Sequence, residues 1–461
     1  MRFSRRALTM CDKQNRVTFE TRDEYQRKPI AEKIIRLLES DAKVSPLVID
    51  GSWGSGKTEF CKKLIHLIED GESSLRPIYV DAFKADHADE PLMTLMAAVL
   101  NALPEAEREP LIKKALPAIK FGVKTALKAG TSWLLKQDAA DVVEDFKDEV
   151  KKAGDELINH AVESVLKDHV DAEQNITTLQ AALFELAKDA PIVLFIDELD
   201  RCRPDFAVNM LENIKHIFDV EGVQFVLITN FDQLRSSINH CYGTGLEDAQ
   251  RYLDKFVQFS LSLSDTHKPD GHESVLASVT HLKDLVGNSE LLDNTDLEKE
   301  GGGYFLASLV AANRLSLREV ETLVLHLEIY QSLTDKKGMQ TRKDFGYCLL
   351  RVLGVFLYCF KPEIAESMRR NALATSDIAA VIGKAELFSK LDEEYPDHGD
   401  TVLAMISAEV PSQNGTFFLS EEEKKRWAET FSDYFRGAYG GRSGRFTDIV
   451  VEAIETMKLA R

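Results

Sequence analysis

Residues 51–58 read GSWGSGKT and follow a short apolar stretch at 46–49. The spacing GxxxxGK followed by Ser or Thr predicts a loop whose backbone N–H groups surround one phosphate at the start of a helix. In such a loop Lys57 reaches the phosphates and the Thr58 hydroxyl binds Mg²⁺. The alternative is a plain glycine-rich turn. The predicted nucleotide-binding residues are Gly51, Ser52, Trp53, Gly54, Ser55, Gly56, Lys57, Thr58 and Glu59.

Two acidic residues follow a second apolar stretch, in the segment PIVLFIDELDR. At the end of this expected strand, Asp197 can hold Mg²⁺ through water, and Glu198 can take a proton from an attacking water. Taken alone, the pair could be solvated acids that cap a strand. Together with the glycine loop, it predicts a phosphoryl-transfer site in which Thr58 and Asp197 organise the metal and Glu198 is the general base.

Asn230 ends a third apolar stretch, in QFVLITNFD, where its amide can orient the water that attacks the γ-phosphate. The alternative is an asparagine that caps the next helix. Phosphoryl transfer also needs positive charge, often from an arginine. Arg201, Arg251 and Arg318 are candidates, and we select Arg201 as the third catalytic residue, although a surface salt bridge also explains each of them.

The composition narrows the class of protein. The chain has 461 residues, of which 44% are hydrophobic, enough for two or three domains with buried cores. Its net charge of −19 argues against a general nucleic-acid coat, because binding phosphate backbones needs clustered Lys and Arg. Six cysteines without CxxC spacing indicate free thiols in a reducing compartment.

Export and membrane insertion are not predicted. The start, MRFSRRALTMC, is basic but lacks the apolar run of a signal peptide, and Met10 is an alternative first residue. The most apolar segment, Phe345–Phe360, is shorter than the ~20 residues of a membrane span and carries Arg351 in its middle, so we expect a buried helix. The sequence therefore predicts a cytoplasmic protein.

The candidate residues can act together only if the strands that they follow lie in one sheet. Apolar runs without alternation predict strands buried on both faces, and helical patterns between them predict a parallel sheet. The fold class is therefore α/β, with helices expected at 23–42 and 90–103. The expected strands are 46–49, 78–80, 191–196, 223–229 and 256–261.

Three parts are expected along the chain. Residues 1–22 form an N-terminal tail and residues 23–265 form the phosphate-binding core. More than one hundred residues separate the second and third strands, and their patterns predict a helical insertion at about 104–188. Residues 266–461 form an α-helical C-terminal region, in which polar or glycine-rich stretches such as 298–305 separate the helices.

Together these motifs resemble the KAP-type P-loop NTPases, a STAND-related family with a catalytic Glu beside the Walker B Asp. The resemblance rests on GSWGSGKT, VDAFKAD, FIDELDRCRP and RYLDKFVQFSLSL, and covers about residues 20–330. Its most specific marks are Trp53 and the DRC run that begins at Asp200. Phe83 replaces the family's usual Trp, which leaves the site intact. The resemblance implies a P-loop core with ATP and Mg²⁺ as cofactors.

Many members of that family carry transmembrane helices between the two Walker motifs, and this chain has an insertion of a different kind there. Residues 111–136 hold six lysines and no acid, with Lys120, Lys124 and Lys128 on one helical stripe beside an apolar stripe. Such a helix can lie in an anionic membrane surface. The alternative that we favour is pairing with the acidic stretch at 138–173.

The motifs predict a Mg²⁺-dependent site for ATP, and the resemblance implies an ATPase that acts as a switch or in assembly. A protein partner or effector and self-association are expected, and direct nucleic-acid binding is not. The resemblance, rather than any residue, suggests a bacterial anti-phage defence system. Two classes stay open: a nucleotide-binding scaffold held peripherally at the inner membrane through residues 111–136, and a DNA-associated ATPase motor or loader.

Overall fold

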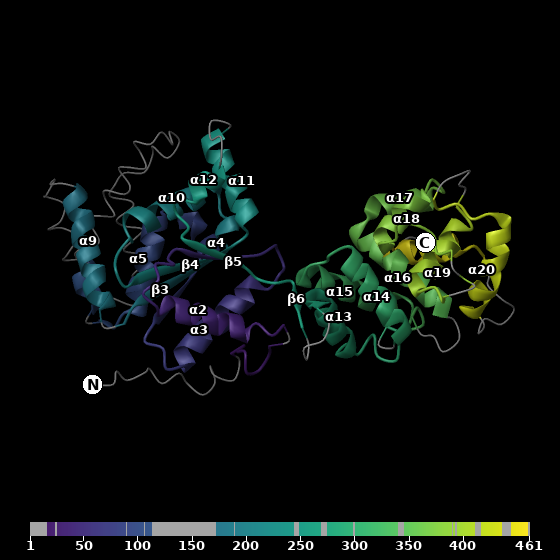
Figure 1. The fold of residues 1–461 in the computed structure, drawn as a ribbon, viewed down its shortest axis with the longest axis horizontal. Coiled ribbons are helices and arrows are strands. Elements are labelled where there is room, and N and C mark those ends of the chain that lie inside the picture. The colour runs from purple at the N-terminus through teal and green to yellow at the C-terminus, as the bar shows by residue number, and fades with distance from the viewer. Residues whose placement is uncertain are drawn as a thin grey trace. The chain divides into compact units, whose positions relative to one another are not determined.

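The computed structural model divides the chain into two compact units, Met1–Ser264 and Asp265–Arg461, each with its own hydrophobic core (Figure 1). The described residues are 16–23, 25–88, 90–105, 107–112, 172–188, 190–243, 249–268, 274–297, 300–339, 345–389, 391, 394–410, 416–435 and 444–459.

The first unit is built on a parallel sheet of five strands in the order β2-β3-β4-β1-β5. The strands are β1 (Leu47–Asp50), β2 (Arg76–Asp81), β3 (Ile192–Asp197), β4 (Val223–Thr229) and β5 (Phe259–Ser262). This confirms the predicted α/β class. The last strand begins at Phe259 rather than at 256, because Phe256 belongs to the preceding turn and packs on Tyr252, with ring centroids 5.0 Å apart.

Helices cover both faces of this sheet, as a parallel sheet requires. Alternate residues of β3 separate the two layers: Leu194 lies in one apolar cluster and Phe195 in the other. On the Phe195 side pack α2 and α3, and on the Leu194 side pack α5, α9, α10, α11 and α12 (Figure 1). Their bounds are α2 (Lys28–Leu38), α3 (Lys57–Asp70), α5 (Pro91–Ala102), α9 (Ala172–Ala187), α10 (Pro204–His216), α11 (Phe231–Tyr242) and α12 (Ala249–Leu253).

Short helical turns follow two of the strands at the carboxyl edge of the sheet. After β2 come α4 (Ala82–Ala85) and the 3-10 turn η1 (Asp86–Ala88), and after β3 comes the 3-10 turn η2 (Leu199–Arg201). Asp81 caps α4 by accepting from the backbone N–H of Lys84 at 3.0 Å. The chain therefore turns sharply where the candidate residues stand.

The ends of the expected insertion pack on the first unit. Leu111 and Leu179 are buried in the cluster that covers the Leu194 face of the sheet. Residues 113–171 lie outside the described residues, and with them the lysine stripe of the segment 111–136 and most of the acidic stretch. The pairing of these two segments stays a prediction.

Where the structure describes the second unit, its regular elements are helices apart from a small hairpin, β6 (Thr266–His267) with β7 (Val275–Leu276). This confirms the α-helical C-terminal region. Its helices are α13 (Ala277–Gly287), α14 (Glu300–Ala312), α15 (Leu317–Leu333), α16 (Phe345–Phe360), α17 (Pro362–Arg369), α18 (Thr375–Ile382), α19 (His398–Ser407), α20 (Glu421–Asp433) and α21 (Phe446–Met457).

Helix α16 is the centre of this unit and the buried helix that the sequence predicts. Leu349, Leu353 and Phe356 are fully buried, and the guanidinium of Arg351 donates to the carbonyl of Gly338 at 2.8 Å. Among the described residues, none of the helices combines the length and the apolar character needed to cross a membrane.

The glycine-rich stretch at 298–305 is not a separator between helices, as the sequence suggested, because Gly301, Gly302 and Gly303 lie in the first turn of α14. A Cβ on Gly302 or Gly303 would come within 2.8 or 2.7 Å of backbone oxygens of Asp296 and Leu297. These glycines therefore permit a close approach of the preceding backbone.

Candidate nucleotide-binding site

The strand order brings the predicted residues to one edge of the sheet. β4 lies between β1 and β3, with Asp50 level with Thr229 and Asp197 level with Ile228. Since all these strands are parallel, their carboxyl ends meet at the same edge. The glycine loop after β1, the acidic pair after β3 and Asn230 after β4 are therefore neighbours.

The loop has the shape of an anion cradle. Gly54 and Gly56 have φ of 75° and 82°, and Gly56 caps the N-terminus of α3. A Cβ on Gly51 would lie 2.8 Å from the Ser55 hydroxyl. Within the described part of the chain that hydroxyl is buried without a hydrogen-bond partner. An unsatisfied donor at a helix N-terminus fits a bound phosphate.

Lys57 lies inside this loop. Its ammonium donates to the carbonyls of Gly51 at 2.5 Å and Ser52 at 3.0 Å. Burial lowers the pKa of Lys57, and the charge of Asp200 is the largest opposing influence. The cation is thus already placed where a phosphate would enter the cradle, beside acidic groups that balance its charge.

Asp197 and Thr58, the predicted metal residues, lie together. Asp197 is 1% exposed, and its carboxylate accepts from the Glu198 backbone N–H at 2.9 Å and from the Tyr79 hydroxyl at 3.0 Å. The Thr58 side chain also hydrogen-bonds it. Burial raises the pKa of Asp197 against these hydrogen bonds. One hydroxyl and one carboxylate fit Mg²⁺, which takes its other ligands from nucleotide phosphates and water.

Glu198 is paired with Arg201. The Arg201 guanidinium lies 3.0 Å from Glu198 Oε1, and both side chains are partly exposed. Burial raises the pKa of Glu198, while the charge of Arg201 lowers it. The salt-bridge alternative for Arg201 is thus seen, with the candidate base itself as the partner. Arg251 lies in α12, and Arg318 lies in α15 of the second unit.

Asn230 has the capping role that the sequence offered as the alternative. Its Oδ1 accepts from the backbone N–H of Gln233 at 3.2 Å and so caps α11. This cap uses the oxygen of the amide, and the Nδ2 group is a separate pair of donors. The capping role therefore leaves the water-orienting role open.

Sequence reasoning missed several residues that support the site. Tyr79 stands on β2, beside β3, where it reaches Asp197. Asp50 ends β1 and accepts from the backbone N–H of Phe231 at 2.9 Å. A polar side chain within or at the end of a short apolar strand was the available signal for both.

Arg27, at the start of α2, was also missed. Its guanidinium donates to the carbonyls of Ser55 at 2.9 Å and Ser264 at 3.0 Å, and the residue is 6% exposed. It therefore links the phosphate loop to the last residue of the first unit. No local pattern marks such a residue, because its partners lie far along the chain.

The segments VDAFKAD and DRCRP are joined by one ion pair. The Arg203 side chain donates to Asp86 Oδ1 at 3.2 Å and to the Asp86 carbonyl at 2.7 Å. This contact fastens the turn after β2 to the turn after β3. Phe83, the departure from the usual family pattern, is 49% exposed.

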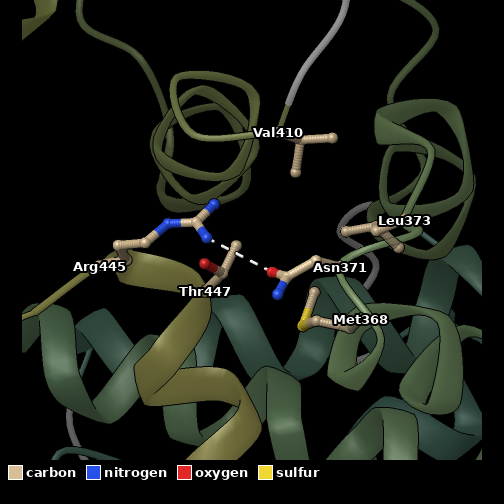
Figure 2. A pocket seen from close by; sticks show the side chains of 6 residues that line it. All are labelled: Met368, Asn371, Leu373, Val410, Arg445 and Thr447. Atoms are coloured by element: carbon tan, nitrogen blue, oxygen red, sulfur yellow. Dashed lines mark hydrogen bonds between the residues drawn. The ribbon is translucent and has the colours of Figure 1, made fainter.

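The second unit has a cavity of its own, of about 80 Å³. Figure 2 shows Arg445 reaching over it to Asn371, with an N–O distance of 3.3 Å. Its lining residues are Met368, Asn371, Leu373, Val410, Arg445 and Thr447. Ligand pockets usually measure about 300–1,000 Å³, so this cavity is too small for a nucleotide.

Two comparisons give partial similarities. A curated relative from Pseudomonas savastanoi pv. phaseolicola (strain 1448A / Race 6), described as 2-dehydro-3-deoxyphosphooctonate aldolase, is 30% identical over 112 residues, which are 24% of this chain and 38% of that protein. The solved "Structure of Drosophila ORC bound to DNA" is 12% identical over 94% of this chain and 81% of its own, with a TM-score of 0.27. Neither similarity assigns an activity.

The family comparison is extensive. The model of the KAP family P-loop domain matches residues 27–334, more than half of the 461 residues. The match includes the glycine loop, both acidic turns and the helices up to α15. It confirms the resemblance that the motifs suggested and supports nucleotide binding by a P-loop NTPase. The chain belongs to the KAP family of P-loop NTPases.

Proposed function

We propose that this protein binds ATP with Mg²⁺ and hydrolyses it at the carboxyl edge of the sheet. The observation that carries the proposal is the meeting of an anion cradle, a hydroxyl–carboxylate pair and a partly buried glutamate at that edge. Phosphoryl transfer depends mainly on positioning and charge, and these groups supply both.

Each group has a definite task in this proposal. The loop N–H groups and Lys57 would hold the phosphates, and Thr58 and Asp197 would hold Mg²⁺, which would supply positive charge against the phosphate oxygens. Glu198 accepts the proton of the attacking water, and its raised pKa makes it a stronger base. The Nδ2 group of Asn230 orients that water. The main task of Arg201 is its ion pair with Glu198.

The test is ATP turnover by the whole chain, with Glu198→Gln and Lys57→Ala as paired variants. We expect Glu198→Gln to bind ATP but lose about 10²–10⁴-fold in kcat, because general-base catalysis contributes that much. Lys57→Ala should lose ATP affinity. Glu185→Gln, an exposed glutamate of α9, is the matched control and should turn over like wild type.

Two results would overturn the proposal to different extents. If the wild type binds no nucleotide in a direct binding measurement, the site assignment is wrong. If it binds ATP and Glu198→Gln turns over as fast as wild type, the site stands but Glu198 is not the base.

We further propose that nucleotide turnover serves a switch or assembly function with a protein partner, in bacterial anti-phage defence. The support is family analogy alone. The test is phage plating on bacteria that carry the gene with its neighbours. We expect fewer plaques with wild type and none of this protection with Glu198→Gln. Equal plaque numbers with wild type and an empty vector would reject the defence role.

A further inference from the structure

Trp53 is an unusual residue for a phosphate loop because it is large, exposed and yet tethered. Its residue surface is 54% exposed, so packing does not account for its presence. Its indole N–H donates to Oδ2 of Asp200 at 2.8 Å. Asp200 is 5% exposed and lies in η2, two residues after Glu198.

The second oxygen of the same carboxylate has a different partner. The Thr229 hydroxyl, which is fully buried, donates to Oδ1 of Asp200 at 3.3 Å. Thr229 is the last residue of β4 and directly precedes Asn230. One buried carboxylate therefore joins the glycine loop, the turn that carries Glu198 and the strand that carries Asn230.

The chemistry of these groups fixes which one donates and which one accepts in the hydrogen bonds to Asp200. An indole N–H can only donate and an ionised carboxylate can only accept, so Trp53 and Asp200 fit in one sense. A buried carboxylate needs such partners, and charge-assisted hydrogen bonds are stronger than neutral ones. Asp200 also opposes the effect of burial on the pKa of Lys57, so its charge acts within the same site.

We propose that the Trp53–Asp200 hydrogen bond is a latch: it fixes the position of the glycine loop relative to the turn that carries Glu198. In this proposal Asp200 is a positioning residue for hydrolysis. The kinetic part of this inference rests on the proposed ATPase function. The latch sets the distance between the bound phosphates and the groups that handle the attacking water. Its loss should therefore lower kcat more than ATP affinity.

The positioning role is tested by the kinetics of Trp53→Phe, Asp200→Ala and the double variant. Trp53→Phe and Asp200→Ala should each lower kcat by up to about 10²-fold, which a misplacement of about 1 Å can cost, and leave the KM for ATP within about threefold. The double variant should be no slower than the slower single one, because both changes break one interaction.

Asp200→Asn separates the hydrogen bond from the charge. Its amide oxygen can still accept from Trp53, and its NH₂ group can donate to the Thr229 hydroxyl, which can act as an acceptor. We expect this conservative variant to keep most of the wild-type kcat. Loss of activity equal to that of Asp200→Ala would assign the whole effect to the charge of Asp200 rather than to its hydrogen bond with Trp53, and would overturn the latch. Wild-type kcat in Trp53→Phe would overturn it as well.

A measurement without ATP tests the latch separately. The chain has three tryptophans, so ¹⁵N-labelled indole N–H resonances are few, and Trp53→Phe assigns one of them. In Asp200→Ala that resonance should shift and exchange faster with solvent, while the other two stay in place. An unchanged resonance would overturn the latch whatever the enzyme does. If the resonance shifts in Asp200→Ala but the wild-type chain does not hydrolyse ATP, the latch stands and the proposed ATPase function is refuted.

Discussion

Glu198 occupies a strained backbone position directly after a buried strand. Its φ is 60°, in the left-handed region that residues with side chains seldom adopt, and such outliers cluster at functional sites. The turn closes because the Arg201 backbone N–H donates to the Glu198 carbonyl at 3.1 Å. The same turn brings the guanidinium within 3.0 Å of the Glu198 carboxylate. The proposed base and the cation paired with it are therefore placed by one local turn.

Replacing Arg201 by alanine tests what that cation contributes. The Arg201 charge lowers the pKa of Glu198, so its removal should raise that pKa and move the acid limb of the kcat/KM profile to higher pH. Above the limb, activity should fall by less than tenfold. An arginine that stabilises the transferring phosphoryl group contributes about 10³–10⁵ in kcat, so a loss of that size at every pH would instead assign Arg201 to the transition state.

At the scale of elements, the end of β1 and the start of α2 form hydrogen bonds with the last residues of the first unit. The Asp50 carbonyl accepts from the backbone N–H of Leu263 at 2.9 Å, and Arg27 spans from Ser55 to Ser264. The chain leaves the sheet for the second unit at this point. Arg27 therefore holds both the glycine loop, at Ser55, and Ser264, where the first unit ends.

Arg27→Ala should weaken this connection. Hydrogen bonds to a charged group contribute about 1.5–3 kcal/mol, and Arg27 is buried, so we expect the first unit to lose about that much stability. Hydrogen exchange should accelerate in peptides that cover the loop and residues 259–264. Arg235→Ala, on the exposed face of α11, is the control and should change stability by less than about 0.5 kcal/mol. Unchanged exchange in both peptides would contradict this role.

At the scale of the whole molecule, the two units bury separate apolar clusters. The sheet of the first unit is enclosed by its own helices, and α16 and α21 form the centre of the second unit. The proposed ATP-binding residues all belong to the first unit. A ligand stabilises the state that binds it, so ATP should act on the two units unequally.

Saturating ATP with Mg²⁺ should therefore protect the first unit selectively. At a concentration of about 100 times Kd the expected gain is about 2.7 kcal/mol. Hydrogen exchange on Glu198→Gln, which avoids turnover, should slow in peptides of β1, β3 and β4 and stay unchanged in α16 and α21. Lys57→Ala should show neither effect. Equal protection of both units would mean that they unfold together.

The sequence by itself determined those features that depend on neighbours along the chain. Apolar runs predicted the strands, and β4 has the predicted bounds because its central run, Phe225–Ile228, is apolar and buried on both faces. The spacing GxxxxGK predicted the loop because backbone geometry and the start of α3 follow within eight residues. The same local logic predicted α16, but it misjudged Gly301–Gly303, whose place in α14 depends on contact with a preceding turn.

Only the tertiary structure decided which distant groups meet. The hydrogen bond between Trp53 and Asp200 joins residues 147 positions apart, and that between Arg27 and Ser264 joins residues 237 positions apart. Neither pair has a periodicity or a fixed spacing that a sequence could display. They meet because the order β2-β3-β4-β1-β5 brings the carboxyl ends of the strands, and the loops that follow them, to one edge of the sheet. The sequence named the chemistry, and packing determined the partners of each group.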